Sequence, residues 1–226
     1  MKTHWLLLCA LSLLLNACAH KGRPTNASNY DTPGLAPQIS DDFVLLEKKI
    51  FEHPALGTML RYLDQNNPND NITIYIYPID KIAWDNPLET INAELQRSLQ
   101  EVDRAVQHGH YKSRFKETIS EYKVYSEGKT YTGKKAQLNI VNQLDQLFYS
   151  DIFVFVAQDK FIKFRTSFNG ENSHFWTGDD IVDSILPHLN VPPESLYMKR
   201  IRGAHKRKLQ QQFLELLIQS SNEGSN

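Results

Sequence analysis

The chain has 226 residues, of which 41% are hydrophobic, so it can build one domain with a sizeable core, and wholesale disorder is excluded. Its 25 Lys and Arg residues oppose 26 Asp and Glu residues, which gives a formal net charge of -1. Because no overall basic field is present to hold phosphates, we expect a folded protein that does not bind nucleic acid.

Residues 1–17 have the pattern of a secretory signal peptide. Lys2 precedes an apolar run from Trp5 to Leu15. A transmembrane helix needs roughly 20 apolar residues, so this run is too short to span a membrane durably and has the length of the apolar part of an export signal. We therefore predict that residues 1–17 are removed from the mature protein.

The end of this signal, Leu15-Asn16-Ala17-Cys18, resembles the lipobox of bacterial lipoproteins, although Asn16 departs from the pattern. The resemblance implies that Cys18 is acylated, with chains such as palmitate, and becomes the mature N-terminus. The next residue, Ala19, resembles those of lipoproteins sorted to the outer membrane, facing the periplasm. The alternative is a general secretory signal cleaved near Ala17 or Ala19, in which Cys18 has no role.

The sequence has two cysteines, and both belong to this leader. Under the lipoprotein interpretation Cys9 leaves with the signal and Cys18 carries the lipid, so the folded part has no thiol. A disulfide, a cysteine nucleophile and a cysteine-ligated zinc site are then excluded. Because each buried CH₂ contributes about 0.8 kcal/mol, the acyl chains would hold the protein on a membrane without a transmembrane helix.

Residues 18–39 have little apolar periodicity and are rich in polar and turn-forming residues, so we predict a lipidated N-terminus with a flexible tether. The folded domain is predicted over residues 40–192. Its first strands are expected at 43–51 and 58–63, followed by a third at 71–79 that pairs with the second as a hairpin. Alternate residues give the third strand an apolar face, formed by Ile72, Ile74 and Ile76.

A helix is predicted from Asn86 to about Gly109. Asn86-Pro87-Leu88-Glu89 has the signature of a helix start: an Asx cap, a proline in the first turn and a glutamate three residues after the cap. Apolar residues then recur at steps of three and four, as expected for one buried helix face. They are Leu88, Ile91, Leu95, Leu99, Val102 and Val106.

Further strands are expected at 115–126, 135–142, 151–157 and 161–168. In the last of these, Lys163 and Arg165 alternate with apolar residues, so we predict that their side faces solvent. Thr177-Gly178-Asp179-Asp180 predicts the start of a second helix, which ends before Pro192-Pro193. The remaining segment, residues 193–226, contains a basic stretch and a third helix at about 205–220.

This element order predicts the α+β class: an antiparallel sheet with helices packed on it. The order resembles the PsbP-type fold of several bacterial lipoproteins and photosystem subunits, together with Phe51, Pro54 and Gly57 before the first hairpin. The resemblance covers about Phe43 to Leu189. It implies accessory and assembly roles more than catalysis, and it provides no site residue.

No common catalytic or phosphate-binding motif is found in the sequence, and we expect no cofactor. His108-Gly109-His110 is the best candidate for a metal site, because alternate residues of an extended segment point to one side. Two ligands are too few for a zinc site. We favour histidines that end a helix, where the helix dipole attracts them, and predict no metal.

The loop before the second helix concentrates acidic, basic and aromatic side chains. Glu171 or Asp179 with His174 could transfer protons, and the helix start could bind an anion. We favour a plainer interpretation, in which this is a polar capping loop and Trp176 covers the core. Four other aromatic residues line an apolar pocket or, as we favour, pack under a helix: Tyr62, Tyr75, Tyr77 and Trp84.

Residues 199–208 form the strongest charge cluster, with six Lys and Arg residues and His205. Such a cluster could contact anionic lipid headgroups, lipopolysaccharide phosphates or an acidic envelope protein. We favour a solvated segment followed by a helix packed on its own domain through Leu209, Phe213, Leu216 and Leu217. The candidate binding residues of the cluster are Arg200, Arg202, Lys206, Arg207 and Lys208.

Two functions follow from these features. We favour a periplasm-facing lipoprotein that is anchored by lipid at Cys18 and has a non-enzymatic binding or envelope-assembly role. The alternative is a periplasmic hydrolase or small-ligand-binding protein that uses the loop around His174.

Overall fold

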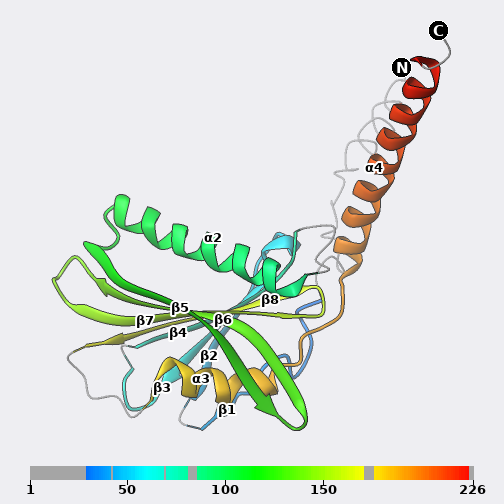
Figure 1. Cartoon of the computed structure of the whole chain (residues 1–226). Coiled ribbons are helices and arrows are strands. Elements are labelled where there is room, and N and C mark those ends of the chain that lie inside the picture. Colours follow the sequence, from blue (N-terminus) through cyan, green and yellow to red (C-terminus); the bar gives the residue numbers. More distant parts are fainter. Residues whose placement is uncertain (1–28, 42, 69, 81–85, 171–175, 224–226) are drawn as a thin grey trace, which may run out of the picture.

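The computed structural model describes residues 29–41, 43–68, 70–80, 86–170 and 176–223. Within these residues, one eight-stranded antiparallel sheet has the order β1-β2-β3-β4-β8-β7-β6-β5, with helix α2 on one face and α3 on the other (Figure 1). The predicted α+β class is therefore confirmed. The signal peptide and Cys18 lie outside the described residues.

The first half of the sheet contains β1 (Ile39–Ser40), β2 (Phe43–Ile50), β3 (Thr58–Asp64) and β4 (Asn71–Pro78), with a short 3-10 turn, η1 (Pro54–Leu56), between β2 and β3. β3 and β4 pair as the predicted hairpin, with Leu60 opposite Ile74. The predicted apolar face of β4 is also confirmed, because Ile72, Ile74 and Ile76 are fully buried on the side of α3.

Helix α2 (Pro87–Gln107) begins as its sequence predicts. The Asn86 side chain accepts a hydrogen bond from the Glu89 amide at 3.2 Å and so satisfies one free amide of the first turn. The apolar face of α2 lies on the sheet over alternate residues of β7, including Ile152 and Val154. Those residues are buried because the helix covers them.

The second half of the sheet is a meander of β5 (Ser113–Ser126), β6 (Lys129–Val141), β7 (Leu147–Ala157) and β8 (Lys160–Asn169). β6 begins six residues before the predicted position. Glu127 and Gly128 join β5 to β6 with φ values of 48° and 76°, the left-handed conformations that a two-residue hairpin turn needs. β8 pairs with β4, so the two halves form one sheet.

The prediction that one side of β8 faces solvent is wrong at Lys163. This side chain is buried beneath α2, and its Nζ lies 3.2 Å from Ser98 Oγ, 3.5 Å from Glu94 Oε1 and 3.4 Å from Glu101 Oε2. Alternation shows which residues share a face, but it does not show whether a helix covers that face. Glu94, itself buried in α2, supplies the opposite charge that a buried lysine requires.

Helix α3 (Gly178–Ile185) covers the opposite face of the sheet and continues into a 3-10 turn, η2 (Leu186–His188). Thr177 caps it as predicted: the Thr177 hydroxyl accepts a hydrogen bond from the Asp180 amide, and the Asp180 carboxylate accepts one from the Thr177 amide. Ile181, Val182 and Ile185 are fully buried against the sheet.

The predicted tether over residues 18–39 is wrong in its described part. Tyr30 and Leu35 are each 1% exposed and belong to the core on the α3 side, and the Leu35 carbonyl accepts a hydrogen bond from the Asn190 amide at 3.0 Å. Isolated apolar residues in a polar segment give no periodic signal, so their burial could not be predicted. They are buried because the folded domain provides a site for them.

Helix α4 (Leu196–Glu223) begins nine residues before the predicted position and projects away from the sheet (Figure 1). The predicted packing of its apolar residues on the domain is wrong: Leu209, Phe213 and Leu216 are 48%, 61% and 64% exposed. The first turns of α4 are held on the domain, where Met198 and Arg202 are buried. No helix in the described ranges is long and apolar enough to cross a membrane.

Candidate functional site

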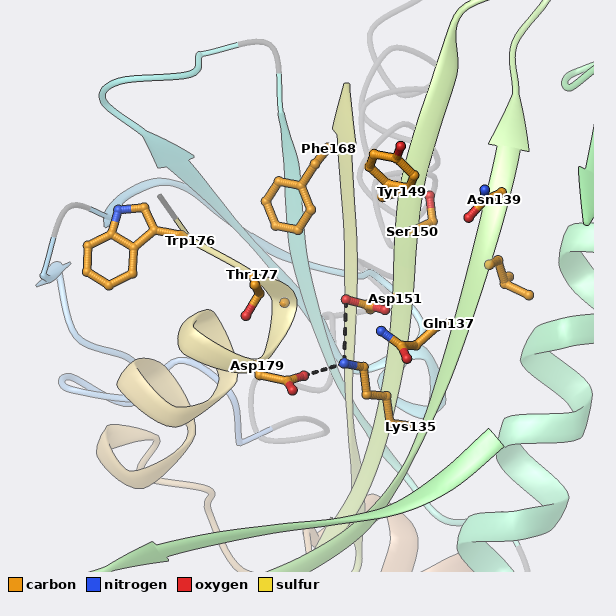
Figure 2. Close-up of a pocket in the computed structure, with 12 residues that line it drawn as sticks. Lys135, Gln137, Asn139, Tyr149, Ser150, Asp151, Phe168, Trp176, Thr177 and Asp179 are labelled. Atoms are coloured by element: carbon orange, nitrogen blue, oxygen red, sulfur yellow. Dashed lines mark hydrogen bonds and ion pairs between the residues drawn. The ribbon is translucent and has the colours of Figure 1, made fainter. Parts of the chain in front are cut away.

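A cavity of about 500 Å³ lies between the start of α3 and strands β6 and β7 (Figure 2). Aromatic side chains from β7, β8 and the segment just before α3 supply an apolar wall: Tyr149, Phe168 and Trp176. Polar side chains line the remainder, among them Lys135, Gln137, Asn139, Ser150, Asp151 and Asp179. An apolar wall beside convergent polar groups is typical of a site for a small polar solute.

The charges of this cavity are paired with one another. The Lys135 ammonium lies between two carboxylates, 2.5 Å from Asp179 Oδ1 and 3.9 Å from Asp151 Oδ2 (Figure 2). It also lies 5.1 Å from the centre of the Phe153 ring, a favourable cation–π distance. Because Lys135 is buried, these partners offset the cost of removing its ammonium group from water.

The Asp151 carboxyl group binds a proton more readily than a free aspartate does. Burial raises the pKa of Asp151 above its usual value, and the nearby Lys135 ammonium opposes part of that rise. Among the described residues, the partner of the Ser150 hydroxyl is another hydroxyl, since its Oγ lies 2.7 Å from Ser167 Oγ. The described groups therefore suit binding through donors and acceptors better than attack by an activated hydroxyl.

The start of α3 approaches this cluster closely because residue 178 is glycine. A Cβ at Gly178 would lie 2.3 Å from Asp151 Oδ2 and 3.0 Å from Thr166 Oγ1. Thr166 is buried on β8, and its Oγ1 has no hydrogen-bond partner among the described residues. Thr166 Oγ1 can therefore form a hydrogen bond with a ligand directly beneath the start of α3.

Replacing Asp151 by asparagine is expected to remove a pH dependence of stability. With its pKa raised in the folded state, Asp151 binds a proton more readily there than in the unfolded chain, so its contribution to stability is present at acid pH and is lost as pH rises through the folded pKa. Urea unfolding of both proteins from acid to neutral pH measures this effect. Asp151→Asn should gain stability relative to wild type as pH rises, and a relative loss would contradict the argument.

The structure places two of the four loop candidates at this cavity. Asp179 pairs with Lys135, and Trp176 lines the wall while its ring packs edge-on against Phe43 at 5.6 Å. Trp176 therefore covers part of the core, as we favoured. Glu171 and His174 lie outside the described residues, so the proton-transfer hypothesis stays a prediction.

Lys135 and Asp151, the central residues of the cavity, were not among the residues predicted from the sequence. Both lie in strands, at positions that alternate with apolar residues. The available signal was a charged residue within a strand that also carries apolar residues. That signal is weak, because such residues are normally exposed.

The other aromatic and histidine candidates have structural contacts. Tyr62 is buried in the core, and Tyr77 packs under α2, where its hydroxyl donates a hydrogen bond to Glu94. Burial, and next the Glu94 carboxylate, raises the pKa of Tyr77. His108 caps the end of α2, with Nδ1 2.7 Å from the Arg104 carbonyl oxygen. Trp84 lies outside the described residues.

Within the described ranges, no three His, Cys, Asp or Glu side chains are grouped so that they could together hold a metal ion.

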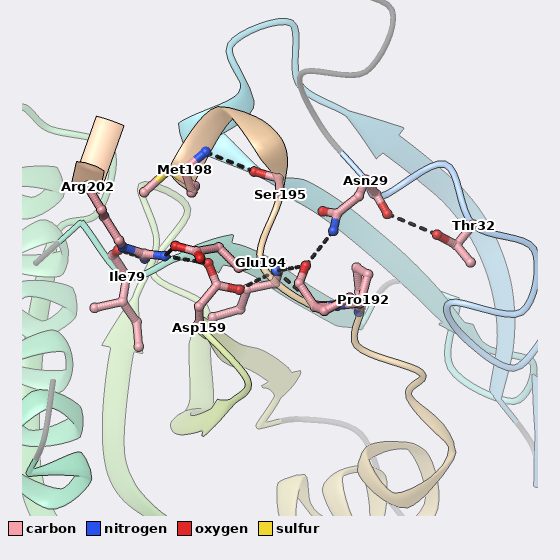
Figure 3. A network of polar contacts seen from close by, with 11 residues as sticks. Asn29, Thr32, Ile79, Asp159, Pro192, Glu194, Ser195, Met198 and Arg202 are labelled. Atoms are coloured by element: carbon pink, nitrogen blue, oxygen red, sulfur yellow. Dashed lines mark hydrogen bonds and ion pairs between the residues drawn. The ribbon is translucent and has the colours of Figure 1, made fainter. Parts of the chain in front are cut away.

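Arg202 is not an exposed binding residue, which corrects our prediction. Figure 3 shows its guanidinium at the base of α4, where Nη1 lies 2.9 Å from Asp159 Oδ2 and contacts Glu194, and Nη2 donates to the Ile79 carbonyl. Lys160 shares the Asp159 carboxylate at 2.5 Å. The other candidates of the basic cluster are exposed: Arg200, Lys206, Arg207 and Lys208.

Comparisons with known proteins give little beyond the fold. No protein-family description and no curated protein matches the chain. Among solved structures, the chain is similar to the solution structure of cyanobacterial PsbP (CyanoP) from Synechocystis, with 14% identity, a TM-score of 0.37, and coverage of 58% of this chain and 72% of that one. The α+β assignment rests on the sheet and helices described above, and the likeness to PsbP adds no functional residue.

Proposed function

We propose that this protein is a lipid-anchored lipoprotein of the bacterial envelope, facing the periplasm, with a non-enzymatic binding or assembly role. The lipid anchor is supported by Leu15-Asn16-Ala17-Cys18 directly after an apolar run of signal-peptide length. Ala19 supports sorting to the outer membrane.

The observation that carries the binding role is helix α4. It is held at its base by Arg202, yet farther along it exposes Leu209, Phe213 and Leu216 by about half or more. Large apolar side chains gathered on one exposed segment mark a surface that contacts a partner or a membrane. The domain thus presents a binding helix at a fixed position.

The contacts within the cavity support a role without catalysis. Lys135 and the two carboxylates neutralise one another, and Ser150 is bonded to another serine. An activated nucleophile needs a neighbouring base, which these contacts do not supply.

Replacing Cys18 by alanine is expected to abolish labelling by radioactive palmitate, because the acyl chains of a lipoprotein attach at this cysteine. Cys9→Ala is the matched control, because Cys9 lies within the predicted signal peptide. An unlabelled wild type, or a Cys18→Ala chain that stays labelled, would show that the lipobox interpretation is wrong.

A second candidate function is binding of a small polar solute in the cavity of Figure 2. The observation that favours it is Thr166 Oγ1, which has no hydrogen-bond partner within the described part of the chain and lies beside Asp151 near the aromatic side chains of the cavity. Native mass spectrometry of the purified protein tests this function, and the absence of any bound solute counts against it.

A further inference from the structure

Charged and apolar residues separate along the axis of α4. Residues 199–208 hold six Lys and Arg residues and no acidic residue, whereas 209–218 hold six large apolar residues. Arg202 is buried at the base, but the other five cations are exposed. The exposed cations of residues 199–208, here called the basic collar, therefore lie between the domain and residues 209–218, here called the apolar half of α4.

The apolar half of α4 is too broad to be the seam of a helix pair. At 100° per residue, Leu209, Phe213, Leu214, Leu216, Leu217 and Ile218 cover roughly 200° of the circumference. A two-stranded coiled coil uses a narrow stripe repeated every seven residues. A parallel pair would also bring two basic collars together, and an antiparallel pair would place cations against leucines. A second copy of the chain is therefore a poor occupant.

Charge is distributed unevenly between α4 and the rest of the protein. Outside residues 199–208, the chain has 19 Lys and Arg residues against 26 Asp and Glu residues, a formal net charge of -7. An anionic surface would attract the collar and repel the body of the domain. That difference would orient the molecule with α4 toward the surface.

The dimensions of α4 suit a membrane interface. Its 28 residues extend about 42 Å, and the apolar half about 15 Å, which is half of a hydrocarbon core of about 30 Å. Of the polar residues in this half, Gln211, Gln212 and Glu215 lie opposite the apolar arc, and Gln210 lies within it. Because the cations and the apolar residues follow one another along the axis, a helix that enters the bilayer end-on would place residues 209–218 among the acyl chains and the cations at the headgroups.

We propose that α4 binds the surface of an anionic lipid bilayer, with its apolar half among the acyl chains and Lys206, Arg207 and neighbouring cations at the phosphates. This inference rests on the proposed function, because it names the surface that the exposed helix contacts. The buried contacts of Arg202 fix the direction in which α4 leaves the domain. The helix would therefore also set the orientation of the domain on the membrane.

Vesicle sedimentation of the full chain carrying Cys18→Ala tests this inference without the acyl anchor. We expect binding to vesicles of phosphatidylcholine mixed with phosphatidylglycerol, weak binding to phosphatidylcholine alone, and loss of binding in high salt. Lys206, Arg207 and Lys208 changed together to glutamine should weaken binding about tenfold or more. Phe213→Ser with Leu216→Ser should weaken it to a similar degree.

The matched control changes three exposed lysines of the β5–β6 hairpin, Lys116, Lys123 and Lys129, to glutamine and should bind like the parent. Every variant retains residues 1–17, so differences between variants report α4. Equal binding by all variants, or equal binding to both kinds of vesicle, overturns the inference. Dimerisation in solution that Phe213→Ser abolishes, or crosslinking from residue 213 to an envelope protein instead of lipid, also overturns it.

The two proposals fail separately. If the chain takes no palmitate but binds anionic vesicles through α4, the lipid anchor is contradicted and the role of α4 is supported. If the chain is acylated but its α4 variants bind like the parent, the anchor is supported and the role of α4 is contradicted.

Discussion

Replacing Asp159 by asparagine is expected to lower the free energy of unfolding by about 3–5 kcal/mol. Asp159 is 4% exposed and accepts from two buried cations. Lys160 lies at 2.5 Å, and Arg202, drawn beside Asp159 in Figure 3, lies at 2.9 Å. The amide keeps the size of the side chain but removes the negative charge. Two cations then remain buried side by side, with Glu194 as the nearest acidic partner of Arg202.

Lys160 illustrates the energetic cost of burying a charge in this network. Burial lowers the pKa of Lys160, and the Asp159 carboxylate opposes that shift. Without the Asp159 carboxylate, less negative charge opposes the lowering of the Lys160 pKa, so Lys160 should lose its proton more easily. Two carbonyl oxygens, of Pro192 and Pro193, still accept from its Nζ at 2.9 Å each, which limits the loss.

Urea unfolding at neutral pH measures the effect of Asp159→Asn. Asp145→Asn is the matched control, because Asp145 pairs with Lys112 on the exposed surface and should change stability by less than about 1 kcal/mol. Similar losses for the two variants would contradict a central role for the buried network. A separate readout is protease cleavage within α4, which should increase in Asp159→Asn because Arg202 loses its partner at the base of the helix.

Replacing Gly57 by alanine is expected to cost about 3–5 kcal/mol, from strain and crowding together. Gly57 has φ 70° and ψ -132°, a conformation that residues with a Cβ rarely adopt. A Cβ there would lie 2.0 Å from the Ile76 carbonyl oxygen and 2.6 Å from Tyr77 Cα. Because both atoms are backbone of β4, the clash can be relieved only by moving the strand.

Gly128→Ala separates backbone strain from crowding. Gly128 also has a positive φ, 76°, but nothing lies within 4 Å of its added Cβ, so only a strain of about 1 kcal/mol is expected. Thermal or urea unfolding of both variants makes the comparison. Equal losses would mean that the approach of Gly57 to β4 has no energetic consequence.

Helix starts and strand faces could be predicted because their signals are local. Asn86 with Glu89, and Thr177 with Asp180, each cap a helix through a bond between neighbouring residues. The apolar face of β4 follows from alternation alone. The signal peptide and lipobox interpretation likewise rests on a contiguous pattern, and it stays a prediction.

The candidate site could not be predicted in the same way. Lys135 and Asp151 come from neighbouring strands, and Asp179 comes from α3, so their meeting depends on how the sheet and helix pack. No spacing in the sequence reports that distance. Sequence analysis found only Asp179 of the three, because it lies in a loop with a recognisable helix start.

The sequence alone determined the class of the fold, since capping, alternation and turn residues act between neighbours in the chain. Tertiary structure decided which faces were covered. It buried Lys163 under α2 and Tyr30 beside α3, and it fixed Arg202 on Asp159. It also left Phe213 exposed, because the contacts at its base direct α4 away from the sheet. Burial depends on residues distant in sequence, which is why the same leucine pattern predicts a core helix and yet forms an exposed one.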